Sequence, residues 1–399
     1  MDPVEILLER TKTNKSIIKK RDTLTFSFIP KLILHRDLEQ KQITQTMLPL
    51  LQQSKPSNLL IYGKTGTGKT LVVQKVLSQI KDHLSKNKIP IKLCYTNSKT
   101  ESTVYGVLVS LGRQLGLDGK SLPSSGLSIS EVFKRLLLII NKTNSSVVFV
   151  LDEIDYLATL IAKTQKDIMY QLTRANELLS GGSLTIIGIS NDLTFKERLD
   201  PRVLSSLSEE EIVFTNYTSL QLHKILEDRA KHAFLEGAVT KSAINLCSAM
   251  AAKEHGDARR AIDLLRVAGE IAEREQDNRV TEKHIRLASK KIEENKEVTA
   301  LQSYPLHEKI LIFSVMKCGG LSTGMIYSTY KNTCKTTRQT PLTQRRVTQI
   351  LAEIEMSGII SSKIIHSGSH GRTKKFSLSI PTSIIKNVFA EDLILGDII

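Results

Sequence analysis

Hydrophobic and polar positions in the first half of the chain alternate between two patterns. Short apolar runs occur between about residues 56 and 215, and longer amphipathic stretches separate them; the runs are "NLLIY", "IKLCY", "SVVFVL" and "LTIIGIS". Short apolar runs indicate buried strands, whereas the stretches between them have the spacing of helices. This alternation predicts a parallel sheet covered by helices.

The pattern changes twice further along the chain. From about residue 219 to 296 the sequence has helical periodicity without strand signals, and the charged run Lys290 to Glu297 indicates a solvated helical connector. From about residue 300 onward, helices precede two short strands, "IISSKII" and "TKKFSLSI". The predicted units are a basic leader (1–25), an α/β domain (26–217), a helical domain (218–298) and a small mixed domain (299–399).

The last unit has the pattern of a winged helix. Apolar positions in "RRVTQILAEI" recur at helical spacing, Thr343 precedes them as an N-cap, and Gly358 follows as a stop. A helix of this kind can enter the major groove of duplex DNA while a basic hairpin touches phosphate. The predicted DNA contacts are Gln344, Arg345, Gln349, Lys363, Arg372, Lys374 and Lys375. Winged helices also serve as protein-interaction modules, and this alternative stays open.

The overall charge supports a polyanionic partner. The formal net charge is +15 with a pI near 9.5, although a basic balance also serves solubility alone. Aromatic residues for stacking on single strands are scarce and Trp is absent, so double-stranded DNA is the predicted partner. The apolar runs are shorter than the roughly 18 residues of a membrane span, and the N-terminus "MDPVEILLER" lacks a basic signal. The expected location is cytoplasmic and nucleoid-associated, with no membrane partner.

A phosphate-binding loop follows the first apolar run. The sequence from Gly63 to Thr70, "GKTGTGKT", matches G-x-x-x-x-G-K-[ST] between a strand and a helix. Glycines let backbone N–H groups turn toward phosphates, Lys69 reaches the outer phosphates, and the helix N-terminus adds positive potential. The expected cofactor is ATP or ADP with Mg²⁺. The predicted nucleotide-binding residues of the loop are Gly63, Lys64, Thr65, Gly66, Thr67, Gly68, Lys69, Thr70 and Leu71.

Two carboxylates end the run "SVVFVL", where a parallel sheet opens toward its ligand. Asp152, together with the Thr70 hydroxyl, is expected to hold the metal, and Glu153 is expected to orient or polarise the attacking water. A solvated acidic pair at a strand end is the alternative.

Three further side chains are candidates for sensing or stabilising phosphate charge. Asn191 ends "LTIIGIS", Arg202 follows in "ERLDPRVLSSL", and Arg259 lies on the first turn of a helix opened by Gly256 and Asp257. Asn191 and Arg202 are expected to take part in hydrolysis, Arg202 in this or a neighbouring subunit. An Asn after a strand is also typical of a turn, and each arginine has the alternative of a surface or packing role.

These motifs in this order, with a helical lid after the α/β unit, resemble the AAA+ ATPases. Longer stretches resemble the archaeal replication initiators related to origin recognition complex subunit 1 and cell division control protein 6 over nearly the whole chain. These stretches are "PKLILHRDLEQ", an insert near residues 98–130, "DPRVLSSLSEEEIVF" and "GDARRAIDLLRVAGE". The resemblance implies an α/β AAA+ P-loop domain, an all-helical lid and a C-terminal winged helix. It also implies that Asn191 and Arg259 are the first and second sensors, Arg202 is the arginine finger, and His35 with Arg36 lies near the adenine.

The function implied by the resemblance is ATP-regulated replication initiation. Such a protein binds duplex origin DNA and helps recruit or load the replicative helicase, with paralogous initiators as further partners and slow ATP hydrolysis resetting a switch. An ATP-driven motor of the branch-migration type and a nucleotide-gated transcription regulator are the alternatives.

Overall fold

The chain divides into two compact units, Met1–Ile285 and Arg286–Ile399. The computed structural model describes residues 16–164, 168–207, 209–319, 322–366 and 372–396. Most of the predicted basic leader and the hairpin loop 367–371 therefore lie outside the described residues. Within the described ranges, no helix is both long and apolar enough for a membrane span.

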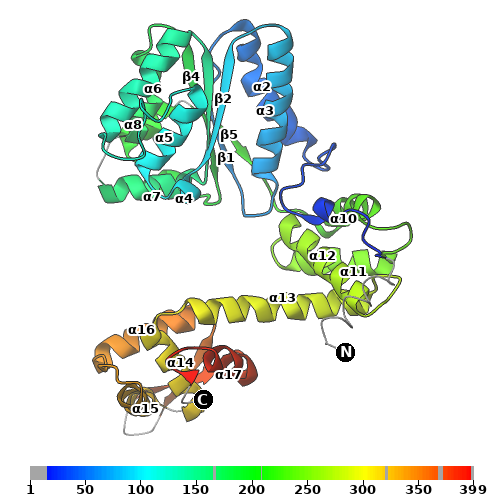
Figure 1. Cartoon of the computed structure of the whole chain (residues 1–399), viewed down its shortest axis with the longest axis vertical. Helices are drawn as coiled ribbons and strands as arrows, with labels where there is room; N and C mark the ends of the chain where they lie inside the picture. Colours follow the sequence, from blue (N-terminus) through cyan, green and yellow to red (C-terminus); the bar gives the residue numbers. More distant parts are fainter. Residues whose placement is uncertain (1–15, 165–167, 208, 320–321, 367–371, 397–399) are drawn as a thin grey trace. The chain divides into compact units, whose positions relative to one another are not determined.

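A five-stranded parallel sheet forms the centre of the first unit, with the strand order β2-β3-β4-β1-β5 (Figure 1). The four apolar runs of the sequence form β1 to β4, and the side chains of β1, β3 and β4 are largely buried because helices pack on both faces of the sheet. Strand β2 stands at an edge of the sheet and is only partly buried. The strands are β1 (Asn58–Tyr62), β2 (Ile91–Asn97), β3 (Ser146–Asp152), β4 (Ser183–Ser190) and β5 (Glu209–Val213).

Strand β5 has no apolar run and was not predicted from the sequence. It stands at the edge of the sheet beside β1. Glu209 and Glu211 pair with Lys196, and Ile212 is buried. Charged edge strands resist pairing with other chains, which explains why a strand here carries so few apolar residues.

Helices cover both faces of the sheet, α2 and α3 on one and α5 to α8 on the other (Figure 1). Ser128 caps the start of α6, since its hydroxyl accepts from the Glu131 N–H at 3.1 Å. The Glu131 carboxylate pairs with Arg135 and does not complete a capping box. The helices are α2 (Asp37–Met47), α3 (Lys69–Lys86), α4 (Ser98–Glu101), α5 (Val104–Leu115), α6 (Ile129–Thr143), α7 (Ile154–Thr164), α8 (Ile168–Thr173) and α9 (Pro201–Leu207), with 3-10 turns η1 (Arg21–Leu24), η2 (Leu48–Gln52), η3 (Ala175–Glu177) and η4 (Phe195–Arg198).

The register of the sheet brings the carboxyl ends of neighbouring strands together. Asn97 of β2 lies opposite Asp152 of β3, and Tyr62 of β1 lies opposite Ser190 of β4. Residues that follow these strands therefore gather at one edge of the sheet, next to the loop after β1.

A helical lid completes the first unit. The Thr218 side chain and Gln221 form a reciprocal capping box at the start of α10. The N-terminal segment attaches to this lid, because Ile18 bridges to Phe234 and Arg21 pairs with Glu273. The lid helices are α10 (Ser219–Ala233), α11 (Lys241–Lys253), α12 (Ala258–Arg274) and the start of α13 (Glu282–Ser303).

A buried histidine closes the turn between α12 and α13. Glu275, Asp277 and His284 bring ligand-type atoms within 4.8 Å of one another, a spacing that would suit a metal ion. However, Nδ1 of His284 accepts a hydrogen bond from the Thr281 N–H at 3.0 Å, so the proton of the neutral ring lies on Nε2, which donates to Asp277 at 3.0 Å. A protonated Nε2 offers no lone pair, and we interpret the cluster as a helix cap.

The second unit packs helices against a two-stranded antiparallel hairpin. The predicted N-cap is present, since the Thr343 hydroxyl accepts from the Arg346 N–H at 3.4 Å. Gly358 follows the helix with φ of 81°, a left-handed conformation that favours glycine. The elements are α14 (Leu306–Cys318), α15 (Thr323–Thr336), α16 (Gln344–Met356), β6 (Ile360–His366), β7 (Arg372–Leu378) and α17 (Thr382–Ala390).

Candidate functional site

A cavity of about 640 Å³ lies at the carboxyl edge of the parallel sheet. Ligand pockets span about 300–1,000 Å³, so the volume suits a molecule of nucleotide size. Its walls come from the loop after β1, from the ends of β2, β3 and β4, from lid helices α10 and α12, and from residues 25–34, which we name the strap.

The loop after β1 is held open by glycines and by one lysine. Gly66 and Gly68 adopt φ of 77° and 91°, which only glycine adopts without strain. Nζ of Lys69 donates to the Gly63 carbonyl at 2.7 Å, the Lys64 carbonyl at 2.9 Å and Oδ1 of Asn191 at 2.9 Å. The lysine is 5% exposed, and burial lowers its pKa to about 8.

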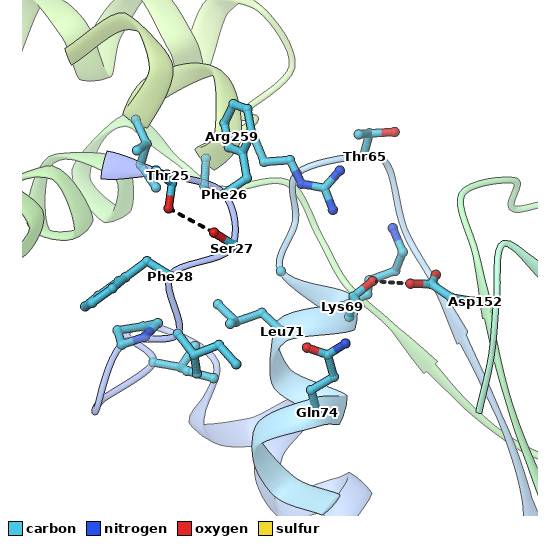
Figure 2. Close-up of a pocket in the computed structure, with 18 of the residues that line it drawn as sticks. Thr25, Phe26, Ser27, Phe28, Thr65, Lys69, Leu71, Gln74, Asp152 and Arg259 are labelled. Carbon is cyan, nitrogen blue, oxygen red and sulfur yellow. Dashed lines mark hydrogen bonds between the residues drawn. The ribbon is translucent and has the colours of Figure 1, made fainter. Parts of the chain in front are cut away.

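The acidic side of the cavity faces the first turn of α3. The Thr70 hydroxyl donates to Oδ2 of Asp152 at 2.8 Å, and Asp152 and Lys69 lie on facing sides of this space (Figure 2). Glu153 also lines the cavity, and its φ of 53° is strained for a non-glycine residue. Strain of this kind concentrates at functional positions.

The end of β4 contributes Asn191 and its support. Oδ1 of Asp155 accepts from the Ser190 hydroxyl at 3.0 Å and from the Asn191 N–H at 3.4 Å. Asp155 therefore holds the turn that presents Asn191 to Lys69.

The lid reaches the phosphate loop directly. Asp257 caps α12 by accepting from the Arg259 N–H at 2.7 Å, and the Ala258 N–H donates to the Gly66 carbonyl at 3.2 Å. The Arg259 side chain extends from α12 toward the loop at Thr65 (Figure 2). A charged group between the loop and α12 would therefore contact elements of both.

The strap forms the apolar part of the cavity, together with Ile225 and Ile262 of the lid. Arg229 of α10 is 6% exposed and holds the strap by donating to the Phe28 carbonyl at 3.4 Å, while its guanidinium lies 4.6 Å from the centre of the Phe28 ring. Phe26 and Phe28 stand on either side of Ser27 at the rim (Figure 2). Apolar and aromatic walls of this kind suit a flat heterocyclic base.

Most of the predicted loop residues line the cavity, but several predicted nucleotide contacts do not. Arg36 is 2% exposed, donates to the Thr67 carbonyl at 3.1 Å and the Thr215 carbonyl at 2.6 Å, and lies 4.1 Å from the Tyr217 ring centre. This guanidinium joins the loop to the segment after β5, and the expectation that Arg36 lies near the adenine stays a prediction. The predicted residues outside the cavity lining are His35, Arg36, Gly63, Lys64, Thr67 and Arg202.

Arg202 lies on α9, away from the cavity of its own chain. Its side chain is 60% exposed, pairs with Asp200 at 2.9 Å, and lies 5.5 Å from the centre of the Tyr170 ring. Of the two predicted possibilities, this position favours action on a neighbouring subunit, which stays a prediction.

The predicted DNA contacts lie on α16 and the hairpin of the second unit. Gln344, Arg345 and Gln349 are exposed on α16. On the hairpin, Lys363 lies directly opposite Lys375, both exposed. Lys374 differs, because its ammonium pairs with Glu355 at 3.0 Å. Arg372 begins β7.

A nucleotide with Mg²⁺ fits the donor set of the cavity. The Thr70 hydroxyl and the Asp152 carboxylate offer oxygen ligands, which Mg²⁺ prefers. A Cβ at Gly66 would lie 1.7 Å from Asp257, and a Cβ at Gly68 would lie 2.9 Å from Tyr217. The loop can therefore keep this conformation only with glycine at both positions. The buried ammonium of Lys69 adds the positive charge that phosphates require.

Known proteins match the chain over its whole length. An AAA domain matches residues 52–193, a Cdc6 AAA+ ATPase-type lid domain matches 223–290, and a CDC6 C-terminal winged helix domain matches 299–388. An ORC1-type DNA replication protein from Cenarchaeum symbiosum is 61% identical over 398 residues, covering 100% of this chain and 97% of the relative. The chain belongs to the ORC1-type DNA replication proteins.

A further member of the ORC1-type family and two solved structures are also similar to this chain. The Thermococcus kodakarensis ORC1-type protein is 43% identical, covering 98% of this chain and 95% of the relative. The structure of the Aeropyrum pernix ORC1 protein in complex with DNA has a TM-score of 0.84 at 38% identity, covering 96% of this chain and 100% of that chain. The Aeropyrum pernix ORC2 protein in ADPNP–ADP complexes has a TM-score of 0.60 at 20% identity, covering 93% and 98%, and shows the shared fold alone.

Sequence reasoning missed several residues of the site in this ORC1-type protein. Tyr95 of β2 donates its hydroxyl to Asp152, and Gln74 of α3, the strap and Arg229 also line the cavity. The strap has no periodic pattern of apolar residues. In the sequence, Tyr95 is a single aromatic residue in a strand, which is typical of packing. No motif in the sequence could have marked either one.

Nucleotide affinity of this ORC1-type protein is expected to fall at alkaline pH. With a pKa of about 8 in the free protein, Lys69 is mostly protonated at pH 7.5 and mostly neutral at pH 9. Phosphates bind the protonated form, so the association constant for ADP should drop roughly tenfold over this range. Equilibrium binding of fluorescent ADP measures this, with the melting temperature at each pH as the control for folding. A flat pH profile would contradict the assigned role of the Lys69 charge.

Proposed function

We propose that this ORC1-type protein is an ATP-regulated DNA replication initiator that binds duplex origin DNA and helps recruit or load the replicative helicase. The observation that carries the proposal is the similarity over 96% of the chain, at a TM-score of 0.84 and 38% identity, to the Aeropyrum pernix ORC1 protein in complex with DNA. We keep the division into an AAA+ domain at 26–217, a lid at 218–298 and a winged helix at 299–399. The helicase as partner, and paralogous initiators as further partners, rest on family membership.

We assign the phosphate end of the cavity to ATP or ADP with Mg²⁺. Thr70 and Asp152 would hold the ion through oxygen, and Lys69 would bind the outer phosphates in exchange for its present carbonyl partners. Bound ATP supplies a terminal phosphate that ADP lacks. Asn191 and Arg259 lie where they would contact this group, from β4 and from the lid.

Glu153 would orient the attacking water, and Arg202 would stabilise the transition-state charge on a neighbouring subunit. Because Arg202 lies outside the cavity of its own chain, hydrolysis by a single chain should be slow. Slow hydrolysis suits a switch that resets once, whereas a motor needs fast turnover. The lid would change position with the bound nucleotide, since the Ala258 N–H of α12 donates a hydrogen bond to the phosphate loop.

The winged helix is the proposed DNA-binding module. Lys363 and Lys375 face one another across the hairpin, and like charges in this position destabilise a two-stranded sheet. A bound anion would relieve the repulsion between these two lysines. Because the protein has a net charge of +15, it attracts polyanions, and DNA phosphate is the anion that we propose. Arg345 and Gln349 are exposed on α16 and would contact base edges if this helix enters the major groove. Lys374 is expected to contribute less, because Glu355 neutralises it.

Binding to origin DNA tests the proposal. Fluorescence anisotropy at about 200 mM salt would compare a duplex from the replication origin with a scrambled duplex, because salt suppresses bulk phosphate attraction. A preference of roughly a hundredfold or more is expected for the origin. Equal affinity for both duplexes would argue against origin recognition.

Variants of the hairpin separate phosphate contacts from base reading. Replacing both Lys363 and Lys375 with alanine should weaken binding to both duplexes equally and lower the salt slope by about two, with the preference retained. Arg345→Ala should instead reduce the preference. Lys386→Ala, an exposed lysine on α17, is the matched control and should change neither quantity.

A further inference from the structure

Tyr95, like Thr70, contacts the carboxylate assigned to the metal. Its hydroxyl donates to Oδ2 of Asp152 at 2.8 Å, and the same oxygen accepts from the Thr70 hydroxyl at 2.8 Å. Asp152 is 6% exposed, so few water molecules can take over either bond. The Glu153 N–H donates to the other oxygen, Oδ1, at 3.0 Å. If Thr70 turns toward a metal ion, Tyr95 remains the side-chain donor that keeps Oδ2 in place.

Tyr95 is itself clamped by a side chain of α5. Strand β2 is at the edge of the sheet and pairs with β3 on one side, where Tyr95 lies opposite Val150. On the other side, Oε1 of Gln114 accepts from the Tyr95 N–H at 2.9 Å, and Nε2 of Gln114 donates to the Tyr95 carbonyl at 2.8 Å. The side-chain amide thus takes the place of a neighbouring strand and fixes the backbone from which the phenol projects.

The phenol ring alone would serve packing equally well as phenylalanine, so the hydroxyl has a separate role. The phenol hydroxyl is a hydrogen-bond donor that phenylalanine lacks, and its acceptor is Oδ2 of Asp152 at 2.8 Å. Carboxylates that bind metal ions are commonly held by such donors, and loss of the donor costs about 10–100-fold in metal affinity or activity.

We infer that Tyr95 is a positioning residue for the Asp152 carboxylate, clamped by Gln114, and that this pair sets the Mg²⁺ concentration at which the cavity binds nucleotide tightly. The inference rests on the proposed nucleotide–Mg²⁺ site. It also connects α5 to that site, because a displacement of α5 would move Gln114, Tyr95 and the carboxylate together.

Binding of a fluorescent ATP analogue at increasing Mg²⁺ concentration tests the inference without measuring hydrolysis. Tyr95→Phe should raise the Mg²⁺ concentration for half-maximal tightening about tenfold, while affinity in EDTA stays within about twofold of the wild type. Gln114→Met, which keeps the length of the side chain and removes its amide, should shift the midpoint in the same direction. Because both act through one carboxylate, the double variant should shift it no further than the larger single variant.

Tyr105→Phe is the matched control. Its hydroxyl donates to the Pro123 carbonyl at 2.7 Å, outside the cavity lining, so the Mg²⁺ midpoint should not change. Melting temperatures of all variants establish that they fold.

The outcomes separate the inference from the function on which it rests. An unchanged Mg²⁺ midpoint in Tyr95→Phe overturns the positioning role, and a shift in Tyr95→Phe without one in Gln114→Met overturns the clamp. If Mg²⁺ does not tighten nucleotide binding to the wild type, the proposed site itself is wrong and the inference falls with it.

Discussion

Replacing Lys69 with alanine is expected to lower the affinity for ATP and ADP on the order of a thousandfold. The ammonium of Lys69 is the buried cation of the phosphate loop, held by the Gly63 and Lys64 carbonyls and by Asn191. A hydrogen bond to a charged group contributes about 1.5–3 kcal/mol, and two such bonds to phosphate about 4 kcal/mol in a site that excludes water. Each 1.4 kcal/mol is about tenfold in affinity. Isothermal titration with each nucleotide measures the loss.

The neighbouring lysine provides the control. Lys64 belongs to the same loop, but it is exposed and does not line the cavity, so Lys64→Ala should bind nucleotide within about threefold of the wild type. A Lys69→Ala protein that folds and binds nucleotide as well as the wild type would refute the assigned site.

Gly66→Ala is expected to reduce nucleotide affinity by up to roughly a hundredfold by driving the lid off the phosphate loop. An added Cβ would lie 1.7 Å from Oδ1 of Asp257, and that carboxylate cannot move freely because it caps α12. Loss of the cap costs about 1 kcal/mol, and the left-handed φ of 77° costs a further 1–2 kcal/mol for alanine. The sum, about 2–3 kcal/mol, corresponds to a loss of affinity of up to roughly a hundredfold. Stopped-flow dissociation of fluorescent ADP measures it.

A double variant separates the steric part of this effect from backbone strain. Asp257→Ala alone should lower affinity by about fivefold through the lost cap. In Gly66→Ala/Asp257→Ala the clash is absent, so the double variant should lose less than the product of the two single effects. Strict multiplicativity would show that Gly66 and Asp257 do not meet. Gly237→Ala is the control, with φ of 73° and no atom within 4 Å of the added Cβ, and should cost stability without changing affinity.

The parts of the fold that were predicted correctly have their determinants close together in the chain. Strand β1, the phosphate loop and the start of α3 lie within Asn58 to Thr70. The motif in this range contains the glycines of the turn, the charged Lys69 and the first residues of the helix. Strands β3 and β4 each have a contiguous apolar run, because they are covered by helices on both faces. The winged-helix elements likewise follow from local caps and helical spacing.

Strand β5 and the strap were missed for different physical reasons. β5 carries Glu209, Glu210 and Glu211 because an edge strand needs few buried side chains, so its composition does not predict a strand. The strap has neither a 3.6- nor a 2-residue period, and its course depends on Arg229, which is about 200 residues away in sequence. The family resemblance implies that Arg36 lies near the adenine, which stays a prediction, whereas its bonds to the Thr67 and Thr215 carbonyls became visible only in the structure.

The sequence by itself determined the order of the domains, the phosphate loop, the acidic end of β3 and the family, because each depends on residues within one or two turns of each other. Only the tertiary structure decided that Tyr95 and Gln114 act on Asp152, that Asp257 meets Gly66, and that Arg202 faces away from its own cavity. These contacts join residues that are distant in the chain. Their geometry depends on sheet register and lid packing, and neither is specified by the residues adjacent to them in sequence.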